Sequence, residues 1–169
     1  IRGDGKEVIA LTVKEHRSGD WSPELTEQEK ETLFAIAGDT LKWCVRDTRA
    51  PFSYEAYTLT PKLEAKAATF VTLKIGHHLR GCIGSLEPVE PLYRSVHHNA
   101  VNAAMRDFRF TPVRASELDS LDVRISILSP IASIPSIDEF RLGAHGIILE
   151  KGRHRAVFLP EVAVEQQWS

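Results

Sequence analysis

The chain has 169 residues, a length typical of one compact domain, and its 43% hydrophobic and 26% charged residues match a globular protein. Its formal net charge of −2 argues against a generally basic nucleic-acid-binding protein, so we expect no nucleic-acid partner. No apolar run approaches the roughly 20 residues of a membrane span, and two cysteines cannot make a disulfide framework. We therefore expect a cytoplasmic protein without a membrane partner.

The N-terminal stretch differs in composition from the rest of the chain. Residues 1–21 hold one short apolar run, Val8–Leu11, among glycines and charged side chains. This run could be an edge strand, a linker or the tail of a preceding domain. We treat residues 1–21 as an N-terminal extension or linker.

A long helix is predicted next. Residues 22–23, Ser-Pro, offer one helix start, and Thr26 with a glutamate three positions later has the spacing of a capping box. Apolar residues then recur at helical spacing over residues 33–44. This pattern indicates an amphipathic helix with Cys44 on its buried stripe. Residues 50–62 carry two prolines and indicate an irregular connection.

A β-hairpin is expected after this connection. The segment Thr69–Ile75 is rich in β-branched and aromatic residues, which is typical of a strand. Residues 76–78, Gly-His-His, have the composition of a turn, and residues 79–84 would return as the partner strand.

The second half of the chain mixes one helix with further strands. Apolar residues recur at helical spacing from Pro91 to Ala104, and residues 122–129 alternate between apolar and polar. Two more strands, 146–150 and 155–159, surround a hairpin signal, and a short helix is expected after them. Hairpins and separate helices favour an α+β fold with a mainly antiparallel sheet and packed helices.

Residues 79–84 contain the most informative chemistry. In a regular strand, Arg80, Cys82 and Gly84 would face one way. Arg80 would then stabilise a thiolate at Cys82 and lower its pKa, as a reactive cysteine requires. Gly81 and Gly84 are costly inside a strand, and such glycines often allow the close approach of a ligand or another backbone.

Two interpretations of this stretch stay open. In the functional one, Cys82 is a thiol at the floor of a cleft, and the glycines leave room for a ligand. In the structural one, a small buried cysteine lies between packing glycines, and Arg80 forms an ordinary salt bridge.

Three further residues could take part in a site. Asp107 and Arg109 flank Phe108 after the second predicted helix. They could pair with each other and fix the loop, or Arg109 could offer its planar guanidinium to a carboxylate or phosphate while Asp107 holds it in position. His145 precedes a strand, where it could transfer protons in a cleft or make a structural hydrogen bond.

The sequence predicts no metal site and identifies no cofactor. His97 and His98 are adjacent on the predicted helix, so their side chains point about 100° apart and cannot easily bind one ion. The chain has no C-x-x-C and no H-E-x-x-H motif.

Several segments resemble the AMMECR domain family, component A of the AmmeMemoRadiSam system. They are TFVTL (69–73), LRGCIGSL (79–86), NAVNAAMRDFR (99–109), ISILS (125–129), HGIIL (145–149) and AVFLPEVAVEQQW (156–168). The LRGCIG string is the most specific of them. We expect an AMMECR domain over residues 22–169. Because the family domain normally continues past Trp168, we also expect its C-terminal tail to be incomplete.

The resemblance implies a fold with a larger and a smaller lobe around a cleft, to which the strand at residues 79–84 is exposed. Carried over position by position, the cleft would be lined by Arg80, Gly81, Cys82, Gly84, Asn99, Asp107, Arg109 and His145. The resemblance also implies association with a Memo-like protein and a radical-SAM protein. It defines no reaction, because the activity of the family is not established.

Two functional hypotheses remain, and the sequence does not decide whether the protein is an enzyme. In the first, the protein is a component of a redox or radical modification system. Cys82 is then the reactive thiol, and His145 or Asp107 moves protons. In the second, the cleft is a non-catalytic binding module for a small anionic ligand or a partner peptide, held by Arg80 and Arg109.

Overall fold

The structure is a computed structural model. It describes residues 8–11, 22–46, 50–131, 138, 140–143, 145–151, 154–160 and 162. The chain divides into two compact units, the first made of residues 1–9 and 24–127 and the second of residues 10–23 and 128–169.

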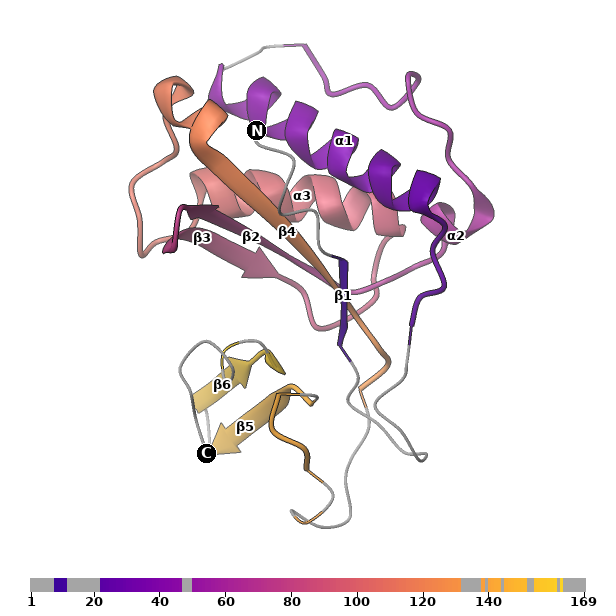
Figure 1. The fold of residues 1–169 in the computed structure, drawn as a ribbon, viewed down its shortest axis with the longest axis vertical. Helices are drawn as coiled ribbons and strands as arrows, with labels where there is room; N and C mark the ends of the chain where they lie inside the picture. The colour runs from indigo at the N-terminus through magenta and orange to yellow at the C-terminus, as the bar shows by residue number, and fades with distance from the viewer. Residues whose placement is uncertain are drawn as a thin grey trace. The chain divides into compact units, whose positions relative to one another are not determined.

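The first unit is built from helices packed on a mainly antiparallel sheet. Its helices are α1 (Glu27–Val45), α2 (Pro61–Glu64), α3 (Leu92–Met105) and the 3-10 helix η2 (Ala115–Ser120). The strands β1 (Val8–Leu11), β2 (Thr69–Ile75), β3 (His78–Gly84) and β4 (Leu121–Leu128) form a four-stranded sheet in the order β1-β4-β2-β3. Helix α3 packs on β2 and β3, and α1 packs on α3 (Figure 1).

The start of α1 confirms the predicted capping box. The Thr26 hydroxyl accepts from the Glu29 N–H at 3.2 Å, and the Glu29 carboxylate accepts from the Thr26 N–H at 2.8 Å. These bonds satisfy donors that a helix N-terminus leaves free, so the helix begins after Thr26 and not at Ser22. The predicted apolar stripe forms the core of α1, where Leu33 and Leu41 are fully buried.

Strand β2 is the centre of the sheet and has two different faces. It pairs antiparallel with β3 on one side and with β4 on the other. Val71 and Leu73 are fully buried beneath the helices, together with Ile125 of β4. Since side chains alternate along a strand, Thr72 points to the sheet face away from the helices. Its cross-strand partners, Cys82 on β3 and Arg124 on β4, point to the same face.

A β-bulge interrupts the pairing of β2 with β3. Leu73 lies opposite Gly81, but Lys74 lies opposite Leu79, so Arg80 is the additional residue. A bulge breaks the regular alternation of side chains and re-aims the side chain it contains. The prediction that Arg80 and Cys82 share a face assumed an uninterrupted strand, and the bulge at Arg80 removes the regular alternation on which it depended.

The second unit contains a two-stranded antiparallel sheet. Strands β5 (Ile147–Lys151) and β6 (His154–Phe158) pair so that Leu149 lies opposite Ala156. They confirm the two strands expected from the sequence. Most of the short helix predicted after them lies outside the described residues.

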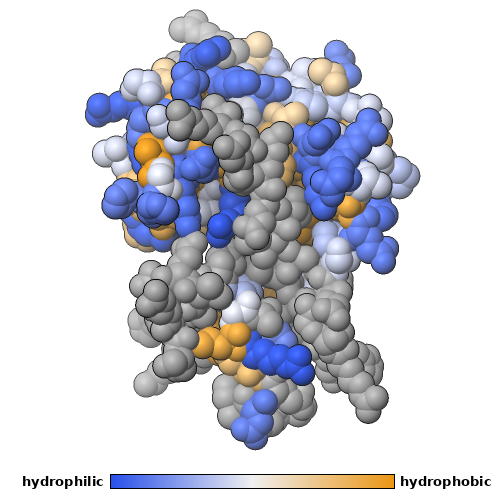
Figure 2. Space-filling model, in the orientation of Figure 1, coloured by the Kyte–Doolittle hydropathy of each residue, from blue (hydrophilic) through white to orange (hydrophobic). Residues whose placement is uncertain are grey.

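These observations confirm the α+β fold with a mainly antiparallel sheet. Strand β1 lies at one end of the sheet, which confirms the edge strand among the three alternatives for residues 8–11. Helix α2 begins at Pro61, within residues 50–62, which were predicted to be an irregular connection. No described helix has the length and hydrophobicity needed to cross a membrane. In the view of Figure 2 the described surface is mainly hydrophilic, with scattered hydrophobic residues.

Candidate functional site

The backbone of Cys82 is held by an ion pair at the edge of the sheet. Cys82 lies on the edge strand β3, and its N–H donates to Asp107 Oδ2 at 2.9 Å. Its carbonyl accepts from Arg109 Nη2 at 3.0 Å. Arg109 also donates to both oxygens of Asp107, at 2.9 and 2.7 Å. One Asp–Arg pair thus satisfies both outward backbone groups of Cys82, as a further strand would. We call Cys82, Asp107 and Arg109 the edge clamp.

The end of α3 places the clamp. The helix stops at Met105, and a turn closed by the Phe110 N–H and the Asp107 carbonyl at 3.0 Å brings the chain back toward β3. Asp107 is only 4% exposed. The hydrogen bonds from the Arg109 side chain are the main reason that the pKa of Asp107 falls to about 2. Its carboxylate is therefore ionised at neutral pH and committed to hydrogen bonds.

The mutual pairing of Asp107 and Arg109 is the first of the two alternatives predicted for them. In the second alternative, Arg109 offers its guanidinium to an anionic ligand. This guanidinium is already bonded to Asp107 and to the carbonyl of Cys82, although the Arg109 side chain is 44% exposed.

The thiol of Cys82 lies on the sheet face away from the helices. Its Sγ is 3.1 Å from the hydroxyl of Thr72, and Thr72 is opposite both Cys82 on β3 and Arg124 on β4. Ser126 lies two residues after Arg124 on β4, so its side chain points to the same face. We call these residues, Thr72, Cys82, Arg124 and Ser126, the polar sheet face.

The site residues predicted from the sequence do not include Thr72, Arg124 and Ser126. Thr72 and Ser126 are buried, at 7% and 0% exposure, which is unusual for polar side chains. The signal was present as polar residues at alternate positions in the predicted strands, but it did not show which face they would share.

Arg109 interacts electrostatically with the thiol of Cys82. The pKa of Arg109 is raised mainly by its hydrogen bonds to Asp107 and, more weakly, by the negative charge of a Cys82 thiolate. This attraction is mutual, so Arg109 favours the thiolate form.

Arg80 is engaged elsewhere. Its Nε and Nη2 donate to the two oxygens of Glu117 at 2.7 and 3.1 Å, and its guanidinium also donates to the carbonyls of Thr111 and Pro112. The side chain is 15% exposed. These bonds agree with the structural interpretation of Arg80, an ordinary salt bridge, rather than with a partner for the thiolate.

The two glycines of β3 are sites of close packing. A Cβ at Gly81 would lie 2.1 Å from the carbonyl oxygen of Ala103 on α3, and a Cβ at Gly84 would lie 2.2 Å from the ring of Phe70. Protein atoms therefore fill the space that the functional interpretation left for a ligand at these positions.

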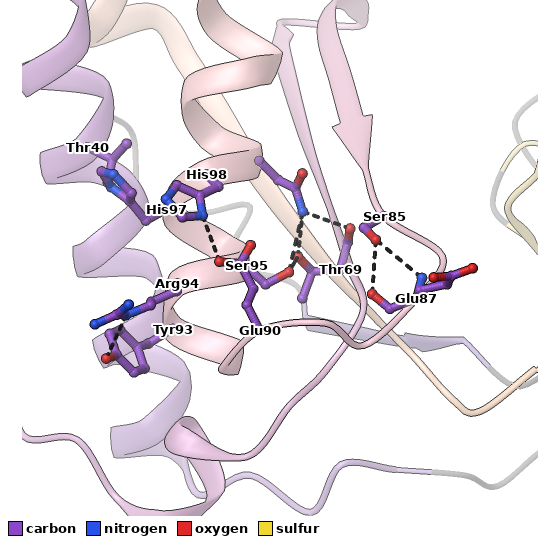
Figure 3. A network of polar contacts seen from close by, with 11 residues as sticks. Thr40, Thr69, Ser85, Glu87, Glu90, Tyr93, Arg94, Ser95, His97 and His98 are labelled. Atoms are coloured by element: carbon purple, nitrogen blue, oxygen red, sulfur yellow. Dashed lines mark hydrogen bonds and ion pairs between the residues drawn. The ribbon is translucent and has the colours of Figure 1, made fainter.

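Asn99 joins α3 to β2 inside the first unit. It is 6% exposed, and its amide donates to the carbonyl and the hydroxyl of Thr69, both at 3.0 Å. Ser95 bonds the same hydroxyl at 2.8 Å (Figure 3). These contacts give Asn99 a structural role in the helix–sheet interface, and its contact with a ligand stays a prediction.

His145 belongs to the second unit and is held by its own turn. Its ring Nδ1 accepts from the backbone N–H of Arg141 at 3.1 Å, and its backbone N–H donates to the carbonyl of Arg141 at 2.9 Å. These are structural hydrogen bonds. A shared site with Cys82 stays a prediction, as does the cleft between two lobes.

Within the part of the chain that the structure describes, no three His, Cys, Asp or Glu side chains are grouped to hold a metal ion. His97 points its Nδ1 at the Thr40 hydroxyl, 2.8 Å away, while the neighbouring His98 pairs with Glu90 at 2.7 Å. Figure 3 shows the two rings in these separate surroundings.

Comparisons with known proteins agree on one family. The sequence pattern of the AMMECR1 family matches residues 34–169. A protein of Methanothermobacter thermautotrophicus is 42% identical over 111 residues, which are 61% of this chain and 57% of that protein. A protein of Methanopyrus kandleri is 33% identical over 153 residues, 85% of this chain and 72% of that protein.

A solved structure shares the fold. The crystal structure of an uncharacterized protein from Pyrococcus horikoshii matches with a TM-score of 0.74 and 32% identity, over 82% of this chain and 72% of that one. The chain spans 57% and 63% of the length of the relatives from Methanothermobacter thermautotrophicus and Nanoarchaeum equitans. The family pattern covers most of the sequence, and the chain therefore belongs to the AMMECR1 family.

Proposed function

We propose that the chain is a component of a redox or radical modification system in which Cys82 is the reactive thiol. The edge clamp carries this proposal. A reactive side chain must be held in a fixed position, and here both backbone groups of Cys82 are bonded to one ion pair whose carboxylate is buried.

The surroundings of the thiol support the proposal in two ways. The hydroxyl of Thr72 lies within hydrogen-bond distance of Sγ and orients it. Arg109 attracts the negative charge of a thiolate, which is the nucleophilic form of cysteine. Cys82 is also half-buried rather than sealed in the core.

Under this proposal Asp107 and Arg109 are positioning residues. A carboxyl with a pKa near 2 is a weak base at neutral pH, so proton transfer by Asp107 is disfavoured. His145 remains the proposed proton carrier, and a Memo-like and a radical-SAM protein remain the proposed partners.

The test compares the two cysteines of the chain. Burial raises the pKa of Cys44 to about 11, so this thiol is an internal control that reacts slowly in the folded protein. The native protein is incubated with iodoacetamide at neutral pH, and peptide mass spectrometry follows the modified fraction of each cysteine. We expect Cys82 to react about 10-fold faster than Cys44, and faster than Cys82 does in urea-unfolded protein.

Variants connect the rate to the geometry. Arg109→Gln removes the positive charge that favours the thiolate, and we expect it to slow the alkylation of Cys82 to the rate of the unfolded chain. Arg106→Gln, which removes the charge of an exposed arginine outside the edge clamp, should leave the rate unchanged. If Cys82 in the native protein reacts no faster than Cys44, or more slowly than in urea, the thiol is structural and the proposal fails.

A further inference from the structure

A hollow of about 410 Å³ lies beside the bulge of β3. It is lined by Arg80, Phe110, Thr111, Arg114, Ser116 and Glu117, which all belong to the first unit. Its volume falls within the roughly 300–1,000 Å³ of small-molecule sites. No residue of the polar sheet face lines it, so it is a separate feature from the thiol.

The acidic group of this hollow is already committed. The carboxylate of Glu117 accepts from Arg80 at 2.7 and 3.1 Å and from the backbone N–H of Arg114 at 2.8 Å. The hydrogen bonds from Arg80 are the main reason that the pKa of Glu117 is lowered. An ionised and fully bonded carboxylate offers little to a cationic ligand.

The second arginine of the hollow is differently placed. Arg114 is exposed, and within the described residues no carboxylate forms an ion pair with its guanidinium. One carboxylate thus faces two guanidinium groups, which leaves the lining with a positive charge. The hydroxyls of Thr111 and Ser116 bond no group in the described part of the chain and add two donors.

An aromatic ring completes the lining. Phe110 is half-buried, and the guanidinium carbon of Arg109 lies 5.5 Å from the centre of its ring. This contact fixes the ring beside the charged groups and gives the hollow an apolar surface next to its polar ones.

We infer that the hollow binds a small molecule in which an anionic oxygen group is attached to a planar ring. Arg114 and the two hydroxyls hold the anion, and Phe110 contacts the ring. A guanidinium presents paired donors that match the oxygens of a carboxylate or phosphate. The inference goes beyond the proposed function, because it needs no reaction at Cys82.

The test is an NMR titration of the isotope-labelled full chain. The probes are benzoate and phenyl phosphate, which differ in the anionic group, and benzyl alcohol, which lacks a charge. We expect at least one anion to cause saturable shifts in the amides of Thr111, Arg114 and Ser116. Benzyl alcohol should bind at least about 10-fold more weakly than the anions, because it has no charge to pair with Arg114.

Matched arginine variants locate the site. Arg114→Gln should weaken anion binding by about 10-fold or more, whereas Arg106→Gln, which changes an exposed arginine outside the hollow, should leave it unchanged. Cys82→Ser should also leave it unchanged, so this experiment and the alkylation experiment can fail independently. The inference is overturned if neither anion saturates these shifts, if benzyl alcohol binds as well as the anions, or if Arg114→Gln binds them like the unaltered chain.

Discussion

His97 shows how a single side chain is matched to its surroundings. It is 7% exposed, it bonds the fully buried Thr40 at 2.8 Å, and its ring lies 4.5 Å from that of Phe52. Burial, assisted by the nearby His98, lowers the pKa of His97 from 6.5 to about 4. The folded protein therefore holds this imidazole neutral at pH values where an unfolded chain would protonate it.

This difference predicts an acid-dependent loss of stability. The stabilisation from neutral His97 is complete above pH 6.5 and is lost as the pH falls from 6.5 through 4, because the unfolded state then binds an additional proton. We expect about 1–3 kcal/mol of the free energy of unfolding to disappear over this window. His97→Gln should remove this loss of the free energy of unfolding between pH 6.5 and 4, measured by urea unfolding at a series of pH values.

The control is a histidine without these contacts. His77→Gln changes an exposed histidine at the β2–β3 turn and should keep the full pH dependence. If His97→Gln and the unaltered chain lose stability in parallel between pH 6.5 and 4, His97 is not the group that titrates.

The edge strand β3 is the element in which the candidate site and the packing of the fold meet. Its inner face touches α3 through Gly81, its outer backbone is bonded by the edge clamp, and its bulge directs Arg80 toward Glu117. A strand held on both sides has little freedom to shift its register. This fixed register places the thiol of Cys82 opposite Thr72.

Substitution of Gly81 tests this packing. Gly81→Ala would place a Cβ 2.1 Å from a backbone oxygen of α3, and backbone atoms cannot move away as a flexible side chain can. We expect the free energy of unfolding to fall by about 2–3 kcal/mol or more, measured by urea denaturation.

Gly76→Ala is the matched comparison. Gly76 has a φ of +59° but open space around it, so its substitution should cost only about 1 kcal/mol of backbone strain. Equal effects of the two substitutions would show that α3 and β3 can separate without cost.

At the scale of the whole molecule, the two units differ in their sheets. The first unit holds most of a four-stranded sheet with a helical layer, whereas the described sheet of the second unit has two strands. A two-stranded sheet buries little and is marginally stable alone. We therefore expect the units to differ in local stability.

Hydrogen exchange measures this difference. Amides of β2, which has a neighbouring strand on each side, should exchange through global unfolding, while those of β5 and β6 should open at a free energy lower by about 2 kcal/mol or more. Equal protection in β2 and β5 would mean that the chain unfolds as a single cooperative unit.

Much of the fold is explained by local sequence signals. The capping box at Thr26, the apolar stripe of α1, the strand Thr69–Ile75 and the β5–β6 hairpin all depend on residues close to one another in the chain. The pairing of Asp107 with Arg109 is equally local, since the two lie on one turn. Propensity and periodicity are sufficient for such features.

Local sequence signals did not predict which residues surround the thiol of Cys82. The partner of Arg80 lies 37 residues away, and the carboxylate that binds the Cys82 N–H lies 25 residues away. Both contacts depend on the bulge in β3 and on the path of the chain after α3. The sequence determined that Arg80 and Cys82 would lie on one strand and that Asp107 and Arg109 would lie close together after a helix. Only the tertiary structure decided that Arg109 rather than Arg80 accompanies the thiol. The reason is that a one-residue change in strand register moves a side chain to the other face, and register is set by packing between distant segments.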